Sequence, residues 1–457
     1  MKLILVTYLV TPTLFAIFIN SLAEEIKKLN CGVKIAEENL DISILLFADD
    51  IVLTSSTEEG LQAQLNTLSE WTKKHRMSVN MDKTRIVHFR PTGTKSTGVK
   101  FTLGEDEVEH ATQYKYLGIT LNENLNYNRT VELLTASGSR ALGAMTAKYI
   151  NAKGLMFKTY TKLYSSTVIP VLHYATAVWG TKVYEKQELV HHRAMRTFLG
   201  VGKKTPIPGL YGETGWPKLK HHKSIEVIKY WLKLFNMDNN RLTKRTFNWD
   251  YRRALQGKKG WNGDVRKILT DNDQIDTFYG LGVESPRKVL VNLENTLAKT
   301  AERKLLDEIN TMPKLRTYKK VKLDTDTEQY VKSNMNRVQR SLIAKLRTGT
   351  FPINIELGRH KRTPVHERTC PHCTDKVEDE IHFTLQCPLY MEERRQLLMT
   401  LEEKADVSVD DLTQEELFFL LLSLSKLSKP LANYLEMTLS TRISYIKEKE
   451  NGAGRKS

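Results

Sequence analysis

Two neighbouring aspartates, Asp49 and Asp50, are the residues of this sequence whose types and spacing point most directly to chemistry. They stand between two apolar runs in the stretch I-L-L-F-A-D-D-I-V-L-T at 44–54, a pattern typical of a β-hairpin with the carboxylates at its tip. Adjacent carboxylates repel each other unless a positive charge compensates them, and oxygen ligands favour a hard cation such as Mg²⁺. Two interpretations stay open. The pair is a magnesium site, or it is the turn of a plain hairpin, since aspartate is a common turn residue.

A second set of residues has the spacing of a metal site. Cys370, Cys373, His382 and Cys387 follow the pattern C-x₂-C-x₈-H-x₄-C. Three thiolates and one imidazole suit tetrahedral Zn²⁺, and the spacing predicts a hairpin followed by a short helix. Three unrelated cysteines with a structural histidine are the alternative. His372 could compete as a ligand, although its place inside the first cysteine pair favours pointing outward. With three of four cysteines inside eighteen residues, the chain is no disulfide scaffold and indicates a reducing, intracellular compartment.

The positive charge of the chain is concentrated in one block. The 457 residues, enough for about three domains, carry a net charge of +16. Residues 185–369 hold 38 basic and 20 acidic side chains, or +18, whereas the remainder holds 31 and 33, or −2. Such a block indicates binding to a polyanion, with a solvated helical surface as the alternative.

Two basic segments of this block are the candidate nucleic-acid contacts. The helical pattern at 328–346 presents Arg337, Arg340, Lys345 and Arg347. The stretch R-H-K-R presents Arg359, Lys361 and Arg362 just before the first cysteine pair. Phosphate contacts of this kind make binding sensitive to salt. A solvated charge run is the alternative.

The apolar N-terminus, residues 2–19, resembles a signal peptide or a short membrane anchor. Pro12 interrupts it, and no clear small-residue cleavage site follows. We therefore favour a buried helix that begins near Pro12 and ends near Leu29. No other segment has the length and apolarity to span a bilayer.

The remaining patterns predict an α+β region followed by helices. Ser56 and Glu59 form a capping-box pattern before a helix, and the tail Gly452–Ser457 is expected to be disordered. Strands are expected at Ile86–Arg90, Lys100–Leu103 and Tyr116–Leu121. Helices are expected at Arg129–Ile150, Leu155–Trp179 with a kink at Pro170, Glu185–Leu199, Leu219–Met237, Arg287–Ile309 and Glu328–Leu346. The Gly-rich, poorly periodic stretch Asn239–Val283 is expected to be a linker or a loop-rich insertion.

Five segments in order resemble the C-terminal part of the reverse transcriptase of non-LTR (LINE-like) retrotransposons. P-T-L-F-A-I-F-I-N-S-L at 12–22 resembles a palm helix, F-A-D-D at 47–50 the catalytic hairpin, and the helix at 57–75 with N-M-D-K-T at 80–84 the next palm motif. Y-K-Y-L-G-I-T-L at 114–121 is similar to the strand pair that grips the primer, and I-P-V-L-H-Y-A-T-A-V-W-G at 169–180 to a thumb helix. A cysteine–histidine knuckle also recurs near the C-terminus of this family.

The resemblance implies a domain order and a chemistry. The expected order is a partial palm at 1–122, a helical thumb at 123–238, a basic linker or insertion at 239–286, a helical nucleic-acid-binding region at 287–369, a zinc knuckle at 370–390, and C-terminal helices with the tail at 391–457. The implied chemistry is phosphoryl transfer assisted by two metal ions, acting on RNA and DNA in the nucleus. Asp49 with Asp50 would bind Mg²⁺. Lys83 would lie near the phosphates of the incoming nucleotide, with a surface lysine as the alternative.

One departure from the family bears on activity. The family uses another metal-binding aspartate on a strand upstream of 12–22, and no residue here matches it or the segment that normally precedes 12–22. Losing a metal ligand typically costs orders of magnitude in rate. We therefore expect a 5′-truncated element or an incomplete gene model with little or no polymerase activity alone, and the missing N-terminal half of the polymerase is a candidate partner. The rival interpretation is a non-catalytic, zinc-containing nucleic-acid-binding protein.

Overall fold

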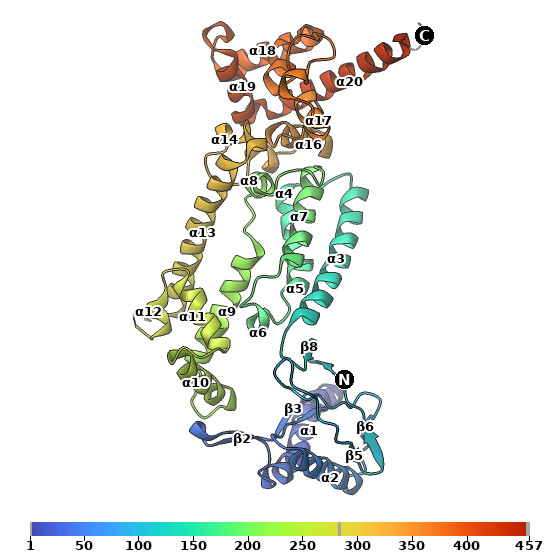
Figure 1. Ribbon diagram of the computed structural model, residues 1–457, viewed down its shortest axis with the longest axis vertical. Helices are drawn as coiled ribbons and strands as arrows, with labels where there is room; N and C mark the ends of the chain where they lie inside the picture. The colour runs from blue at the N-terminus through green and yellow to red at the C-terminus, as the bar shows by residue number, and fades with distance from the viewer. Residues whose placement is uncertain (1, 282–284, 454–457) are drawn as a thin grey trace. The chain divides into compact units, whose positions relative to one another are not determined.

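The computed structural model describes residues 2–281 and 285–453, which fall into two compact units. The N-terminal unit combines the chain up to Glu132 with Lys229–Ile268. The helical unit combines Leu133–Ile228 with the chain from Leu269 onward. Within the described residues every strand belongs to the N-terminal unit, and helices occur in both (Figure 1). This is the α+β composition that the sequence predicts.

The strands of the N-terminal unit pair as antiparallel hairpins. They are β1 (Val33–Ile35) with β2 (Leu40–Ile42), β3 (Ile44–Phe47) with β4 (Asp50–Leu53), β5 (Phe101–Leu103) with β6 (Asp106–Val108), and β7 (Gln113–Tyr116) with β8 (Ile119–Asn122). The strand expected at Ile86–Arg90 is reduced to a single bridge between Ile86 and His110. The strand expected at Tyr116–Leu121 is divided, because Leu117 and Gly118 have φ angles of 47° and 81° and form a two-residue hairpin turn.

The first helix begins earlier than the sequence predicts. α1 spans Lys2–Lys28, so Pro12 lies inside the helix and not in its first turn. A proline inside a helix lacks one backbone donor but does not prevent helix formation on both sides of it. The C-terminal half of α1 packs on α2 (Glu58–Lys74) and on the hairpins, and this core consists of Ile19, Leu22, Ala23, Ile26, Ile44, Leu65, Leu68, Trp71, Phe101, Leu103 and Val108.

α2 begins one residue later than the predicted capping box. The side chain of Thr57 accepts a hydrogen bond from the backbone N–H of Gly60 at 3.1 Å, so Thr57 is the N-cap residue. The Ser56 hydroxyl instead donates to the backbone carbonyl of Gly32. The helix itself lies where the apolar periodicity places it.

The stretch expected to be a linker or loop-rich insertion is helical. It contains α10 (Leu242–Leu255), α11 (Trp261–Thr270) and the short α12 (Ile275–Phe278); residues 282–284 lie outside the described residues. Phe247, Ala254, Val265 and Leu269 are buried. Their spacing is interrupted by glycines, and the burial arises from packing on other elements, which local periodicity does not reveal.

The helical unit, with α3 and α9 partly shared with the N-terminal unit, is built from helices of varied length. They are α3 (Asn128–Asn151), α4 (Phe157–Thr167), α5 (Ile169–Leu172), α6 (Thr176–Trp179), α7 (Glu185–Leu199), α8 (Ile207–Thr214), α9 (Leu219–Phe235), α13 (Pro286–Thr311), α14 (Tyr318–Val321), α15 (Gln329–Lys332), α16 (Arg337–Arg347), α17 (Asn354–His360), α18 (Met391–Ala405), α19 (Gln414–Ser423) and α20 (Ser428–Ala453). Single turns, all 3₁₀ except the π-helical η4, are η1 (Ala36–Glu38), η2 (Pro313–Leu315), η3 (Val365–Glu367), η4 (His382–Gln386), η5 (Pro388–Tyr390), η6 (Val409–Asp411) and η7 (Ser425–Leu427).

Two of the predicted long helices are broken in the structure. The helix expected at Leu155–Trp179 is divided into α4, α5 and α6, with Ala175 at a φ of 53° between the last two. The helix expected at Glu328–Leu346 is divided into α15 and α16. Asn336 starts α16 with a full capping box, in which its side chain accepts from the N–H of Gln339 at 2.9 Å and the Gln339 side chain accepts in return.

The chain ends differ from the predictions in extent. α20 continues to Ala453, so Gly452 and Ala453 of the predicted disordered tail are helical, and residues 454–457 lie outside the described residues. Within the residues that the structure describes, no helix combines the length and the apolarity needed to cross a bilayer.

Candidate active site and metal centre

The Asp-Asp pair lies at the tip of a two-residue hairpin. β3 and β4 pair with Phe47 opposite Asp50, which leaves Ala48 and Asp49 as the turn. Ala48 has a φ of 53°, the left-handed conformation that such turns require and that alanine rarely adopts. Both aspartates are exposed. The hairpin therefore presents two adjacent carboxylates to solvent, as the sequence predicts.

Strand β7 brings the Lys83 segment and the aspartate hairpin to one part of the N-terminal unit. Tyr114 and Tyr116 alternate along β7, so their side chains lie on the same face. The Tyr114 hydroxyl donates to the backbone carbonyl of Lys83 at 3.0 Å. The pKa of Tyr116 is raised by burial and then by the negative charge of Asp50, which lies near it. Lys83 itself is exposed.

In the part of the chain that the structure describes, Asp49 and Asp50 share no metal-ligand group with a third histidine, cysteine, aspartate or glutamate. Across residues 2–281 and 285–453, only one group brings three or more histidine, cysteine, aspartate or glutamate side chains close enough to share a metal ion, and Asp49 and Asp50 are not in it. Two carboxylates offer the oxygen ligands that Mg²⁺ prefers. A two-metal site normally needs further carboxylates, so the described residues supply part of such a site.

The group that does meet this condition is the predicted cysteine–histidine set. The ligand atoms of Cys370, Cys373, His382 and Cys387 all lie within 4.8 Å of one another. The Cys387 sulfur lies 3.7 Å from that of Cys370 and 3.9 Å from that of Cys373, too far for a disulfide. Two thiolates on a tetrahedral zinc ion, with Zn–S bonds of about 2.3 Å, lie about 3.8 Å apart. The sulfur spacing thus fits zinc.

Local hydrogen bonds shape this knuckle as a hairpin followed by one helical turn. Thr369 and Val377 form an antiparallel bridge, and the N–H of Cys370 donates to the carbonyl of Lys376 at 2.8 Å. Asp379 then accepts from the N–H of His382 at 2.7 Å and starts η4. The predicted hairpin and short helix are both present.

The histidines of the knuckle take different roles. Both ring nitrogens of His382 are buried and have no hydrogen-bond partner in the described part of the chain. A buried imidazole without a partner is costly, and a bound metal ion would remove that cost at one nitrogen. His372 lies outside the ligand group, and its ring packs edge-on against Tyr445 of α20 at a centroid distance of 5.2 Å. This agrees with the outward orientation that its sequence position favours.

Buried ion pairs hold the acidic loop of the knuckle, T-D-K-V-E-D-E at 374–380. Glu378 forms two hydrogen bonds of 2.7 Å with Arg442 of α20, and both side chains are buried. Glu380 and Glu356 are buried beside Arg316, which contacts them at 2.7 Å and 2.8 Å. No local pattern indicates these pairs, because the partners stand 40 to 64 residues apart. They turn the acidic side chains inward.

Two of the predicted nucleic-acid contacts are core residues instead. Arg340 is 1% exposed. Its guanidinium donates to the backbone carbonyl of Phe198 at 2.9 Å and lies over the aromatic ring of the same residue. Arg347 is also 1% exposed. The prediction that these two arginines contact phosphates is therefore wrong. A guanidinium on a helix has the same sequence signature whether its partner is a phosphate or a buried acceptor on another element.

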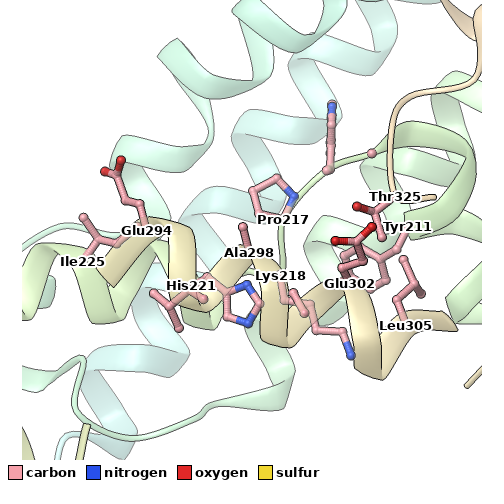
Figure 2. A pocket seen from close by; sticks show the side chains of 14 residues that line it. Tyr211, Pro217, Lys218, His221, Ile225, Glu294, Ala298, Glu302, Leu305 and Thr325 are labelled. Carbon is pink, nitrogen blue, oxygen red and sulfur yellow. The ribbon is translucent and has the colours of Figure 1, made fainter. Parts of the chain in front are cut away.

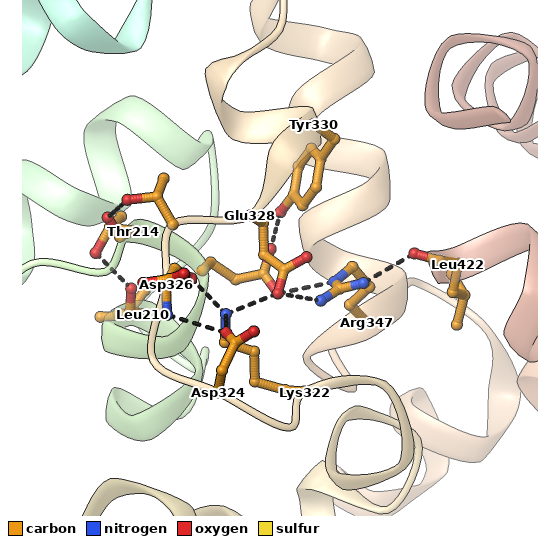
Figure 3. Close-up of polar contacts among 11 residues, drawn as sticks. Leu210, Thr214, Lys322, Asp324, Asp326, Glu328, Tyr330, Arg347 and Leu422 are labelled. Atoms are coloured by element: carbon orange, nitrogen blue, oxygen red, sulfur yellow. Dashed lines mark hydrogen bonds and ion pairs between the residues drawn. The ribbon is translucent and has the colours of Figure 1, made fainter. Parts of the chain in front are cut away.

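Arg347 belongs to a buried network of alternating charges (Figure 3). Its side chain pairs with Glu213 at 2.8 Å and with Glu328 at 2.9 Å, and it donates to the carbonyl of Leu422 at 2.9 Å. Lys322, equally buried, pairs with Glu328 at 2.8 Å. Tyr330 donates to the Glu213 carboxylate. Burial raises the pKa of Glu213, and the positive charge of Arg347 lowers it. The effect of burial is larger, so the pKa of Glu213 is raised.

The other predicted contacts remain accessible. Arg337, Lys361 and Arg362 are exposed, whereas Lys345 and Arg359 are half-buried. Arg359 makes an ion pair with Glu356 at 3.2 Å.

The fold adds basic neighbours that sequence reasoning missed. Lys314 of η2 donates to the carbonyl of Lys204 at 2.7 Å. The pKa of His360 is lowered by desolvation and then by the charges of Lys204 and Lys314. Three segments distant in sequence thus form one cationic surface beside the knuckle, defined by Lys204, Lys314, Arg359, His360, Lys361 and Arg362.

A groove of about 200 Å³ lies in the helical unit between the α8–α9 segment and α13. Figure 2 shows Lys218 and His221 on one side and Glu294 and Glu302 on α13. His221 lines this groove, whereas His191 and His192 are buried in the core.

Comparison with known proteins identifies the N-terminal unit. Residues 9–121 match the family described as reverse transcriptase (RNA-dependent DNA polymerase). The chain carries a reverse transcriptase domain. The matched range contains α1 from residue 9 onward, the Asp49–Asp50 hairpin, α2, and the β7–β8 hairpin except its last residue. These elements carry the first four segments on which the resemblance is based.

The relatives of this reverse transcriptase domain come from mobile elements. The chain is 31% identical over 175 residues to the RNA-directed DNA polymerase from mobile element jockey of Drosophila funebris, covering 37% of this chain and 18% of that protein. It is 26% identical over 159 residues to the probable RNA-directed DNA polymerase from transposon BS of Drosophila melanogaster, covering 33% and 18%. It is 31% identical over 120 residues to the Pol polyprotein from type-1 retrotransposable element R2 of Nasonia vitripennis, covering 24% and 11%.

These matches confirm the resemblance to non-LTR retrotransposon reverse transcriptases. The chain spans less than a fifth of the length of the curated relatives that it matches. The knuckle lies outside residues 9–121.

Proposed function

We propose that this chain supplies part of an RNA-directed DNA polymerase that acts on RNA and DNA. Asp49 and Asp50 would bind Mg²⁺ at the primer 3′-end, and Lys83 would lie near the phosphates of the incoming nucleotide. The single observation that supports this best is the exposed Asp-Asp hairpin inside the reverse transcriptase domain. Magnesium bound there would stabilise the charge that develops during phosphoryl transfer. The nuclear location of such an enzyme is part of the same proposal.

The same proposal assigns zinc to Cys370, Cys373, His382 and Cys387. The sulfur spacing and the unpartnered His382 ring support it. The ion would have a structural role, since four protein ligands leave no open position for a substrate. It would tie the 369–377 hairpin to η4 and so hold the cationic surface beside the knuckle.

The proposed nucleic-acid contacts are the accessible members of the predicted set. Arg337, Lys345, Arg359, Lys361 and Arg362 remain available to phosphates. Phosphate contacts position a nucleic acid without reading its sequence, which is what a polymerase requires.

A second candidate function is supported by the missing third ligand. Since Asp49 and Asp50 have no third metal-ligating side chain near them in the described residues, the chain alone would act as a non-catalytic, zinc-containing nucleic-acid-binding protein. Polymerase activity would then require at least one further carboxylate at this site, from outside the described residues.

Primer extension tests these alternatives. The full chain is incubated with an RNA template, a DNA primer, nucleotides and Mg²⁺, beside its Asp49→Ala variant. We expect no extension by either protein and equal binding of the RNA–DNA hybrid by both. Extension that Asp49→Ala abolishes would show that the site is complete, and the second candidate would be wrong.

A further inference from the structure

The helices α10 and α11 and the loop between them form a strongly basic helix–loop–helix, which we call the basic hairpin. Residues 241–267 contain nine lysines and arginines against two aspartates. They are Arg241, Lys244, Arg245, Arg252, Arg253, Lys258, Lys259, Arg266 and Lys267. A net charge of +7 over 27 residues is much denser than that of the 185–369 block as a whole.

The basic hairpin is rigidly built at its base. The Asp250 carboxylate accepts from the backbone N–H of Asn262 at 2.8 Å and from its side-chain amide at 2.9 Å, which fixes the start of α11. The Asn262 side-chain oxygen in turn accepts from the Trp231 ring N–H at 2.8 Å. A Cβ at Gly260 would meet the Asp250 carboxylate at 2.1 Å, so a larger residue there would displace Asp250 from its present position.

The basic hairpin docks on η1 and Asn39, the connection between β1 and β2 in the N-terminal unit. Arg245 donates to the backbone carbonyls of Glu38 and Asn39, and Arg252 pairs with the Glu38 carboxylate. α10 thus lies against η1, next to the β1–β2 hairpin (Figure 1). The chain returns to the unit that carries Asp49 and Asp50 after about a hundred residues in the helical unit.

The basic side chains divide into two groups by their surroundings. Lys244 is buried and donates to the carbonyl of Phe235 at 2.6 Å, and it joins Arg245 and Arg252 in holding the structure. Lys258 and Lys259 are exposed in the loop Q-G-K-K-G. Arg253, one turn before this loop, lies over the Trp249 ring at 4.8 Å, which adds a planar surface to the positive charge.

We propose that the exposed loop of the basic hairpin binds the phosphodiester backbone of the nucleic acid held by the N-terminal unit. Lys258 and Lys259 would contact phosphates, and the Arg253–Trp249 pair would support the adjacent sugar–phosphate segment. Exposed lysines beside an arginine-stacked aromatic ring are the combination used for sequence-independent binding. The choice of nucleic acid as partner rests on the proposed function, because the hairpin docks on the reverse transcriptase domain.

The test compares the salt dependence of binding in matched variants of the full chain. The probe is a fluorescent 20-nucleotide RNA–DNA hybrid, titrated at several salt concentrations. The variant is Lys258→Gln with Lys259→Gln, and the control is Lys27→Gln with Lys28→Gln, two exposed lysines at the end of α1 in the same unit. All proteins are checked for equal thermal unfolding.

We expect the Lys258→Gln, Lys259→Gln variant to lower the slope of log K against log salt by about 2, since each lost phosphate contact lowers it by about 1. The control should keep the wild-type slope. An unchanged slope, or an equal fall in the control, would overturn the proposal. A loss of binding only to anionic phospholipid vesicles would overturn it as well, in favour of a membrane surface.

Failure of this proposal is separable from failure of the proposed function. If the Lys258→Gln, Lys259→Gln variant lowers the salt slope by about 2 yet Asp49 proves irrelevant to metal binding near the primer, the basic hairpin stands and the polymerase assignment falls.

Discussion

Arg347 is held by two carboxylates and a carbonyl in the interior of the helical unit. Removing one partner of a buried ion pair leaves the other charge unpaired and costs about 3–5 kcal/mol. We therefore predict that Arg347→Ala lowers the free energy of unfolding by about that amount in urea denaturation. Arg337→Ala, ten residues away and exposed, should change it by no more than about 0.5 kcal/mol. If Arg347→Ala has normal stability but binds nucleic acid poorly, Arg347 contacts phosphates, as the sequence predicts, and is not a core residue.

Cys387 is the ligand whose sulfur lies close to both other thiols. We predict that the purified protein holds about one zinc ion per chain and that Cys387→Ser loses it, because three remaining ligands bind zinc much more weakly. Elemental analysis after dialysis measures the metal. Cys31→Ser is the matched control, since Cys31 lies outside the ligand group, and zinc loss in that variant would contradict the assignment.

At the residue scale the sequence predicted what depends on local spacing. The Asp-Asp turn and the cysteine–histidine set are each contained in one short segment, so type and spacing were enough. The roles of Arg340 and Arg347 depend on Phe198 and Glu213, which stand 142 and 134 residues away. A pattern within one helix carries no information about such partners, and two of the seven predicted nucleic-acid contacts were therefore wrong.

At the element scale α7 places a histidine in the core of the helical unit. The Nε2–H of His191 donates to the Pro217 carbonyl at 3.0 Å, so Nδ1 of the neutral ring accepts from the Tyr164 hydroxyl at 2.9 Å. Burial lowers the pKa of His191 to about 3. The unfolded chain, with a histidine pKa near 6.5, binds the proton more tightly. The contribution of neutral, buried His191 to the free energy of unfolding is therefore complete above about pH 6.5 and is lost as the pH falls toward about 3.

We predict that this one histidine gives the free energy of unfolding a slope of about 1.4 kcal/mol per pH unit between about pH 4 and 6. Urea denaturation across this range measures it. His191→Gln should lower the slope by that amount, and His366→Gln, at an exposed position, should leave it unchanged. Equal slopes in all three proteins would show that His191 is not buried in its neutral form.

The elements themselves were predictable where periodicity was strong. α2, α3, α7 and α13 begin and end within about two residues of their expected positions. The broken helices α4–α6 and α15–α16 depend on turns whose geometry, such as the left-handed Ala175, is imposed by packing. The helices of the basic hairpin were missed because their apolar residues are few and their burial comes from Trp231 and the β1–β2 hairpin.

At the scale of the whole molecule, two stretches distant in sequence build the N-terminal unit. The reverse transcriptase match ends at residue 121, yet Lys229–Ile268 completes the unit. The domain order expected from the sequence divides the chain into consecutive blocks. It therefore does not include a later segment, Lys229–Ile268, that belongs to the N-terminal unit. The arrangement places the densest positive charge of the chain in the unit that carries the aspartate hairpin.

Iron-directed cleavage is the measurement that tests most directly whether Asp49 and Asp50 hold a metal ion at the primer end. Fe²⁺ replaces Mg²⁺ in the full chain bound to an RNA–DNA hybrid, and ascorbate with peroxide then generates hydroxyl radicals at the bound iron. We predict cleavage within a few nucleotides of the primer 3′-end, which the variant Asp49→Asn with Asp50→Asn abolishes without loss of hybrid binding. Uniform cleavage, or a pattern that the variant retains, would contradict the assignment of this hairpin as a polymerase metal site.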